Sequence, residues 1–215
     1  MTGVYVPAGE VRLEGDLEMP AGAGGLVIFA HGSGSGRHSP RNRQVAAALN
    51  GAGFGTLLFD LLTAEEEIED RIDARLRFNV PLLAGRLSRV VAWARVEEGV
   101  AGLPVGLFGA STGAAAALVA AAACPGDVAA VVSRGGRPDL AAHSLSEVRA
   151  PTLLIVGGRD LEVLSLNEQA LERMDAAAGH ELTLVPGAGH LFEEPGALEE
   201  VARLSAEWFR ANLRK

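Results

Sequence analysis

Residues 105–123 read VGLFGASTGAAAALVAAAA, and this stretch decides the fold. Its first four residues are apolar without alternation, which is typical of a strand buried on both faces of a parallel sheet. The alanine-rich segment 114–123 favours a helix. Between the two lies the G-x-S-x-G sequence of residues 109–113, which predicts a tight turn that presents Ser111 as a nucleophile at the sheet edge. Taken alone, the turn also fits an ordinary glycine-rich connection with a capping serine.

The same alternation of strands and helices extends along the chain. Residues 4–6 and 11–17 alternate in polarity around Pro7-Ala8-Gly9 and predict an antiparallel hairpin. Later apolar runs predict buried parallel strands, at residues 26–30, 56–59, 105–108, 128–132, 152–156 and 182–185. We therefore expect an α/β fold, with a mostly parallel sheet and helices on both faces. No linker or repeat is visible, so we expect one domain over residues 1–215.

One intervening helix has a clear start signal. Thr63-Ala64-Glu65-Glu66 is a capping-box pattern, and acidic residues fill the first turn of the helix that it predicts. Arg71, Arg75 and Arg77 follow and would complement the negative end of the helix dipole. The sequence therefore predicts a helix that continues through these arginines.

Composition excludes several classes of protein. The formal net charge of −8 argues against nucleic acid or an anionic membrane surface as a partner. The chain has no apolar stretch of the roughly 20 residues that a membrane span needs, and its start lacks the features of a signal peptide. Cys124 is the only cysteine, so no intrachain disulfide is possible. We expect a cytoplasmic protein with no cofactor, and no residue spacing suggests a metal site.

Two downstream loops offer partners for Ser111. A serine hydroxyl is a weak nucleophile that needs a base, usually histidine, oriented by a carboxylate. The run 152–156 leads into Asp160, and the run 182–185 leads into His190, so both side chains follow the carboxyl ends of strands. Asp160 also fits a turn residue or a helix N-cap, and Glu162 and Asp139 are the alternative acids. His190 also fits a loop histidine without a role.

A further glycine-rich loop follows the run 26–30. It reads HGSGSG and begins at His31. Acyl transfer needs backbone N–H groups aimed at the tetrahedral oxyanion. We expect one from Thr112, directly after the nucleophile, and one from Ser33 in this loop. His31 follows the strand and is expected to shape the loop, and it is also a candidate to contact the substrate.

Four motifs together resemble the α/β-hydrolase superfamily, closest to its small dienelactone hydrolase-like branch. They are GASTG, GGRD, GAGHLF and HGSGSG, and the resemblance runs from about residue 10 to residue 213. It implies an eight-stranded sheet, a Ser111–Asp160–His190 triad and two oxyanion amides. Dienelactone hydrolases proper carry a cysteine nucleophile where this chain has Ser111, which argues against dienelactone as substrate. The interval 132–152 leaves no room for a large helical cap.

We therefore expect a serine hydrolase that cleaves short-chain carboxylic esters through an acyl-enzyme. Thioesters and lactones are the alternative substrates of the same triad, and a non-catalytic ligand-binding homologue is the alternative role. A dinucleotide-binding protein is excluded, because G-x-G-x-x-G fails whether it begins at Gly32 or at Gly34. The expected partner is a small-molecule ester, and the expected assembly is a monomer or a small homo-oligomer.

Three arginines near the predicted site have two interpretations. Arg37 follows the loop that begins at His31, and Arg134 and Arg137 follow the run 128–132. Arginine binds carboxylate or phosphate with a fixed fork, so these side chains are candidates for an anionic substrate group. The alternative is internal pairing, with Asp60, Asp139 or the acidic run 65–70.

Overall fold

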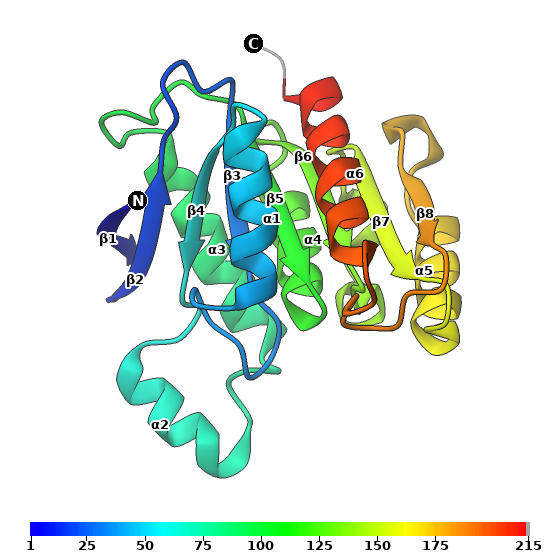
Figure 1. Ribbon diagram of the computed structural model, residues 1–215. Coiled ribbons are helices and arrows are strands. Elements are labelled where there is room, and N and C mark those ends of the chain that lie inside the picture. Colours follow the sequence, from blue (N-terminus) through cyan, green and yellow to red (C-terminus); the bar gives the residue numbers. More distant parts are fainter. Residues whose placement is uncertain (214–215) are drawn as a thin grey trace.

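The computed structural model describes residues 1–213, which form one eight-stranded sheet with helices on both faces (Figure 1). The strand order is β1-β2-β4-β3-β5-β6-β7-β8. The strands are β1 (Thr2–Ala8), β2 (Val11–Glu18), β3 (Leu26–Ala30), β4 (Gly55–Phe59), β5 (Val105–Ala110), β6 (Val128–Arg134), β7 (Thr152–Gly157) and β8 (Glu181–Val185). β2 runs antiparallel to β1 and β4, and the remaining pairs are parallel. The predicted hairpin and the mostly parallel sheet are confirmed.

The helices lie in two layers. They are α1 (Pro40–Gly51), α2 (Ala64–Asp73), α3 (Val80–Ala94), α4 (Thr112–Ala123), α5 (Leu161–Arg173) and α6 (Ala197–Asn212). α1 and α6 cover one face of the sheet, and α3 and α4 lie behind the other (Figure 1). Between β6 and β7 the described chain forms only two short 3₁₀ turns, Pro138–Ala141 and Leu145–Glu147, so no large cap covers the sheet edge.

Burial explains why the central strands have continuous apolar sequences. Every residue of β3, β4, β5 and β7 is buried, because helices cover both faces of the sheet. β2 lies toward the edge, and its first residues alternate between exposed and buried. Phe29 and Phe108 meet on the α1–α6 side with ring centroids 4.8 Å apart. No helix within residues 1–213 is both long and apolar enough to cross a bilayer.

α2 projects beyond the carboxyl edge of the sheet, at the bottom of Figure 1. Its capping box forms as predicted, with Thr63 and Glu66 bonded reciprocally. The prediction that the helix continues through Arg75 and Arg77 is wrong. The helix ends at Asp73, because Ala74 adopts a left-handed conformation (φ 56°) that turns the chain. Arg77 then folds back onto the buried carboxylate of Asp70.

Candidate active site

Ser111 occupies a strained turn between β5 and α4. Its φ of 51° and ψ of −120° are unfavourable for a residue with a Cβ atom. Neighbouring backbone holds this conformation: the Ser111 N–H donates to the Arg134 carbonyl, and the Arg137 N–H donates to the Ser111 carbonyl, both at 3.1 Å. A side chain at Gly113 would overlap the carbonyl oxygens of Ala30 and His31. The glycine thus lets the turn sit close to the end of β3.

The structure brings Ser111, His190 and Asp160 into one hydrogen-bonded chain. Ser111 Oγ lies 3.3 Å from His190 Nε2, and His190 Nδ1 lies 2.7 Å from Asp160 Oδ2. Because a carboxylate can only accept hydrogen bonds, Nδ1 carries the proton and Nε2 is left as an acceptor facing the serine. The His190 side chain is 38% exposed and that of Asp160 is 15% exposed. The arrangement can therefore deprotonate a hydroxyl at a site open to solvent.

Asp160 is the acid that contacts His190. It stands at the N-cap position of α5, yet its side chain makes no capping hydrogen bond, because the carboxylate turns toward His190. Of the alternative acids, Asp139 accepts two hydrogen bonds from Arg137, at 2.8 and 2.7 Å. Glu162 lies in the first turn of α5. Among residues 1–213, neither alternative acid bonds to His190.

Hydrogen bonds between the two loops fix the position of His190. The Arg159 N–H donates to the Ala188 carbonyl at 2.9 Å, which ties the Asp160 loop to the His190 loop. Glu194 accepts from the Gly189 N–H at 3.0 Å and from the Arg159 guanidinium. The backbone amides of Glu194 and Gly189, followed by Arg159, lower the pKa of the Glu194 carboxyl. The negative charge of Glu194 therefore supports the turn that carries His190.

Glu194 was not predicted from the sequence, and Phe192 appeared there only as the last residue of the GAGHLF motif. Phe192 is 1% exposed and has a φ of 56°, so its ring anchors the loop in the core despite an unfavourable backbone conformation. The only sequence signals were an aromatic residue two positions after His190 and an acid four positions after it. Neither spacing is distinctive without the fold.

The two residues expected to form the oxyanion site are neighbours, but one amide is already in use. The Ser33 N–H donates to the Thr112 hydroxyl at 2.8 Å, whereas we expected it to be free for an oxyanion. The Thr112 side chain reaches across from the start of α4 and takes that position. Thr112 is the first residue of α4, so its own N–H has no acceptor within the helix.

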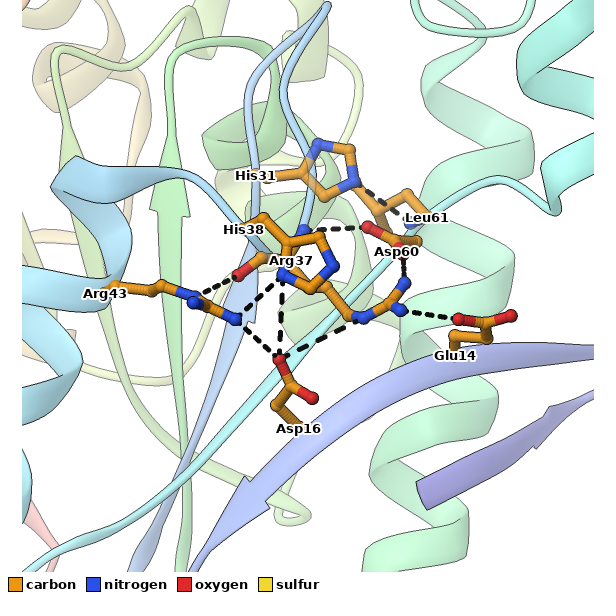
Figure 2. Close-up of polar contacts among 8 residues, drawn as sticks. All are labelled: Glu14, Asp16, His31, Arg37, His38, Arg43, Asp60 and Leu61. Carbon is orange, nitrogen blue, oxygen red and sulfur yellow. Dashed lines mark hydrogen bonds and ion pairs between the residues drawn. The ribbon is translucent and has the colours of Figure 1, made fainter. Parts of the chain in front are cut away.

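His31 and Arg37 hold the loop that contains Ser33. His31 Nε2 accepts a hydrogen bond from the Leu61 N–H at 3.0 Å, and burial lowers the pKa of this imidazole. Figure 2 shows the Arg37 guanidinium between the carboxylates of Asp60 and Glu14. The Arg37 N–H also donates to Asp60 at 2.7 Å. His31 and Arg37 are therefore engaged within the protein.

Arg137 and Arg134 differ sharply in their surroundings. Arg137 is engaged by Asp139, as internal pairing requires. Arg134 is only 7% exposed, and its Nε and Nη1 atoms are buried without a hydrogen-bond partner anywhere in residues 1–213. Burial, together with the nearby charge of Arg41, lowers the pKa of Arg134 to about 10.

A cleft of about 700 Å³ opens beside the loop that contains Ser33. It is bounded by residues 31–41 on one side and by α2 with its flanking residues on the other. Ser111 and His190 do not line the cleft, but Gly32 does, and a side chain at Gly32 would contact Ser111 Cβ at 3.2 Å. The cleft therefore reaches the nucleophile through Gly32. Within the described part of the chain, no group of three or more His, Cys, Asp or Glu residues is placed to hold a metal ion.

Comparison with known proteins places these features in context. The model of the dienelactone hydrolase family matches residues 14–212. The crystal structure of a dienelactone hydrolase from Anabaena variabilis superposes with a TM-score of 0.97 at 56% identity, covering 99% of this chain and 98% of that one. Est1E from Butyrivibrio proteoclasticus shares the fold, with a TM-score of 0.80 at 16% identity over 97% of this chain and 98% of its own.

Two curated Mycobacterium tuberculosis proteins are also similar. Both bear the provisional name phosphoribosyl transferase, and each is 59% identical over 206 residues. The match covers 96% of this chain but only 45% of theirs, so this chain spans less than half the length of these relatives.

Proposed function

Because the chain belongs to the dienelactone hydrolase family, we propose that it is a serine hydrolase that cleaves short-chain carboxylic esters. The observation that carries this proposal is the hydrogen-bonded chain from Ser111 Oγ through His190 to Asp160. A serine in a strained strand-to-helix turn, with a histidine and a carboxylate in sequence behind it, is the arrangement that acyl transfer needs.

The reaction proceeds in two halves. Ser111 Oγ attacks the ester carbonyl while His190 Nε2 takes the hydroxyl proton, and Asp160 stabilises the imidazolium that forms. The intermediate then collapses and its C–O bond to the leaving group breaks. His190 gives this proton to the departing alkoxide, which leaves as the alcohol, and the acyl group stays on Ser111 as an ester. In the second half His190 deprotonates a water molecule, which attacks the acyl group. The carboxylic acid leaves and Ser111 recovers its proton from His190.

The tetrahedral intermediate carries a negative charge on the former carbonyl oxygen. We assign its stabilisation to the N–H of Thr112, supported by the positive end of α4. The Ser33 N–H is the second donor. It can donate to the oxyanion if its hydrogen bond to the Thr112 hydroxyl breaks, or if it donates to the hydroxyl and the oxyanion at the same time. Each such donor is typically worth about 3 kcal/mol of transition-state stabilisation.

The missing cap favours short acyl groups. Most residues that line the cleft beside Ser33 are polar or charged, and no cap encloses the site, so a long acyl chain would stay largely in contact with water. Lactones and thioesters react by the same steps and remain alternative substrates; the Anabaena relative at 56% identity is named a dienelactone hydrolase. The name phosphoribosyl transferase belongs to Mycobacterium tuberculosis proteins that are more than twice as long as the segment that matches this chain.

The decisive experiment replaces Ser111 with alanine. We expect Ser111→Ala to lower kcat for p-nitrophenyl acetate by about 10⁴- to 10⁶-fold without changing the melting temperature by more than a few degrees. In the unmodified protein, an alkyl fluorophosphonate should add its mass to the peptide that contains Ser111. A folded variant that keeps a tenth of the activity, or labelling elsewhere, would show that another residue is the nucleophile.

A further inference from the structure

Arg134 is a buried cation next to the nucleophile. It is the last residue of β6 and pairs in register with Ala110, which directly precedes Ser111. Its carbonyl accepts the Ser111 N–H. Adjacent strands lie about 4.8 Å apart, so the backbone of Arg134 is one strand spacing from the reacting serine.

The Arg134 side chain lies on the face of the sheet that α1 and α6 cover. Side chains two residues apart in a strand share a face, and Ala130 and Val132 belong to the core beneath these helices. At the carboxyl edge this face is bounded by the start of α1 and by the loop that carries His190. Arg41 is the second residue of α1, and its Nη1 donates to Glu193 at 3.0 Å. Arg41 lies close enough to Arg134 for its charge to contribute to the lowered pKa of Arg134.

Unpaired burial distinguishes Arg134 from the other buried arginine, Arg86. Arg86 is 6% exposed, but its guanidinium binds both carboxylate oxygens of Glu66 and the Leu61 carbonyl. Arg134 is equally buried, and it takes part in no ion pair within the described chain. A buried charge is normally paired, because desolvating it without a partner is costly. Arg134 therefore lacks an anion that Arg86 already has.

The neighbouring polar groups also suit an anion. The Nε atom of Arg41 is buried and has no hydrogen-bond partner within residues 1–213. Arg41 also lines the cleft that contains Gly32 and Ser33 of the oxyanion loop. α1 begins here as well, so the positive end of its dipole adds to the two cationic charges. Nε and Nη1 of Arg134 and Nε of Arg41 are therefore free donors near the start of α1, while Arg41 Nη1 stays paired with Glu193. An oxyanion can accept two hydrogen bonds from an arginine fork, so these donors suit an anionic group.

We propose that Arg134 and Arg41 form a subsite for an oxyanionic group, carboxylate or phosphate, carried by the ester substrate. The inference rests on the proposed ester hydrolysis, because only the proximity of Ser111 makes the bound anion part of a substrate. The preferred substrates are then acidic esters, whose charged group lies a few bonds from the scissile carbonyl.

The test compares matched substrates on matched variants. Mono-p-nitrophenyl glutarate and a p-nitrophenyl phosphonoalkanoate are the carboxylate and phosphorus-oxyanion probes, and p-nitrophenyl pentanoate is the neutral reference. The readout is the ratio of kcat/KM for an anionic ester to that for the neutral ester. We expect Arg134→Met to lower this ratio by about 10- to 150-fold, the loss of a charge-assisted hydrogen bond. The anionic ester with the larger ratio shows whether the subsite prefers a carboxylate or a phosphorus oxyanion.

Arg137→Met is the matched control. Arg137 is three residues away and carries the same charge, but it is paired with Asp139, so its replacement should leave the ratio unchanged. Arg41→Met should lower the ratio too, and it serves as the second variant if Arg134→Met does not fold. A ratio of one in the unmodified protein, or an equal drop in Arg137→Met, would overturn the proposal.

Direct binding separates this proposal from the proposed function. Inorganic phosphate or glutarate should raise the melting temperature of the unmodified protein, and Arg134→Met should abolish that rise. Without anion, Arg134→Met should melt no lower than the unmodified protein, because an unpaired buried charge is replaced by an apolar group. If no ester is cleaved but binding depends on Arg134, the hydrolase proposal fails and the anion site stands. If esters are cleaved but no anion binds, the anion site fails.

Discussion

Replacing Asp160 with asparagine measures what its carboxylate contributes to the proposed reaction. The substitution keeps the size of the side chain but removes the negative charge that faces the imidazolium. At the observed separation of 2.7 Å, Coulomb's law gives about 6 kcal/mol at an effective dielectric constant of about 20, and about 3 kcal/mol at about 40. The higher constant is included because the His190 side chain is 38% exposed. Since each 1.36 kcal/mol changes a rate tenfold, kcat should fall by about 150- to 30,000-fold.

The assay is the steady-state hydrolysis of p-nitrophenyl acetate, with a melting curve recorded for each variant. Asp139→Asn and Glu162→Gln are the matched controls, since each removes one carboxylate near the site without touching His190. Both should keep kcat within about threefold of the unmodified protein, as expected for positions outside the reacting groups. A folded Asp160→Asn enzyme with more than a tenth of the original kcat would refute the electrostatic role. A comparable loss in either control would assign that role to a different acid.

Three further measurements follow from the structure. Activity on p-nitrophenyl esters should peak at acyl chains of about two to six carbons, because the open site buries little apolar surface at roughly 25 cal/mol/Å²; faster cleavage of dodecanoyl than of butanoyl esters would contradict this. Burial lowers the pKa of His31, so below its ordinary value of 6.5 the unfolded chain takes up a proton more readily than the folded protein. The contribution of His31 to the free energy of unfolding should therefore be fully present above about pH 6.5 and be lost as the pH falls toward the lowered pKa. In urea unfolding at a series of pH values, His31→Gln should make this loss smaller. If the free energy of unfolding depends on pH in the same way in both proteins, His31 is not the source of the loss. Glu66→Gln should cost about 3–5 kcal/mol of stability by leaving Arg86 buried without its counter-charge. Glu65→Gln in the same turn is the control and should change stability by about 0.5 kcal/mol or less.

The architecture could be predicted because local pattern and tertiary environment agree. The apolar runs mark strands that are buried on both faces, and the alternating hairpin marks the sheet edge. The elbow was recognisable because its glycines, serine and following alanines are contiguous. Asp160 and His190 could be proposed because each directly follows a strand, and parallel strands bring their carboxyl ends to one edge.

Features that depend on contacts between distant segments could not be predicted. Nothing local indicates that the Thr112 hydroxyl takes the Ser33 N–H, because the two residues meet only after β3 and β5 pair. The pairing of Arg37 and the isolation of Arg134 also look alike in sequence, since both arginines follow buried strands. The end of α2 was misplaced for a local reason: the Asp70 carboxylate accepts the N–H groups of Leu76 and Arg77, and this turn competes with the helix that the arginines favour.

The ion pairs of Arg37 join segments that sequence alone would treat as separate modules. Glu14 and Asp16 belong to the outer hairpin, Asp60 follows β4, and Arg37 extends from the loop that contains Ser33 (Figure 2). In protein engineering, the hairpin and this loop should therefore be replaced together. A chimera that takes the hairpin of a relative without matching acids would leave Arg37 with fewer counter-charges, and the loop that contains Ser33 would be held less firmly. A library that varies both segments together keeps that charge balance.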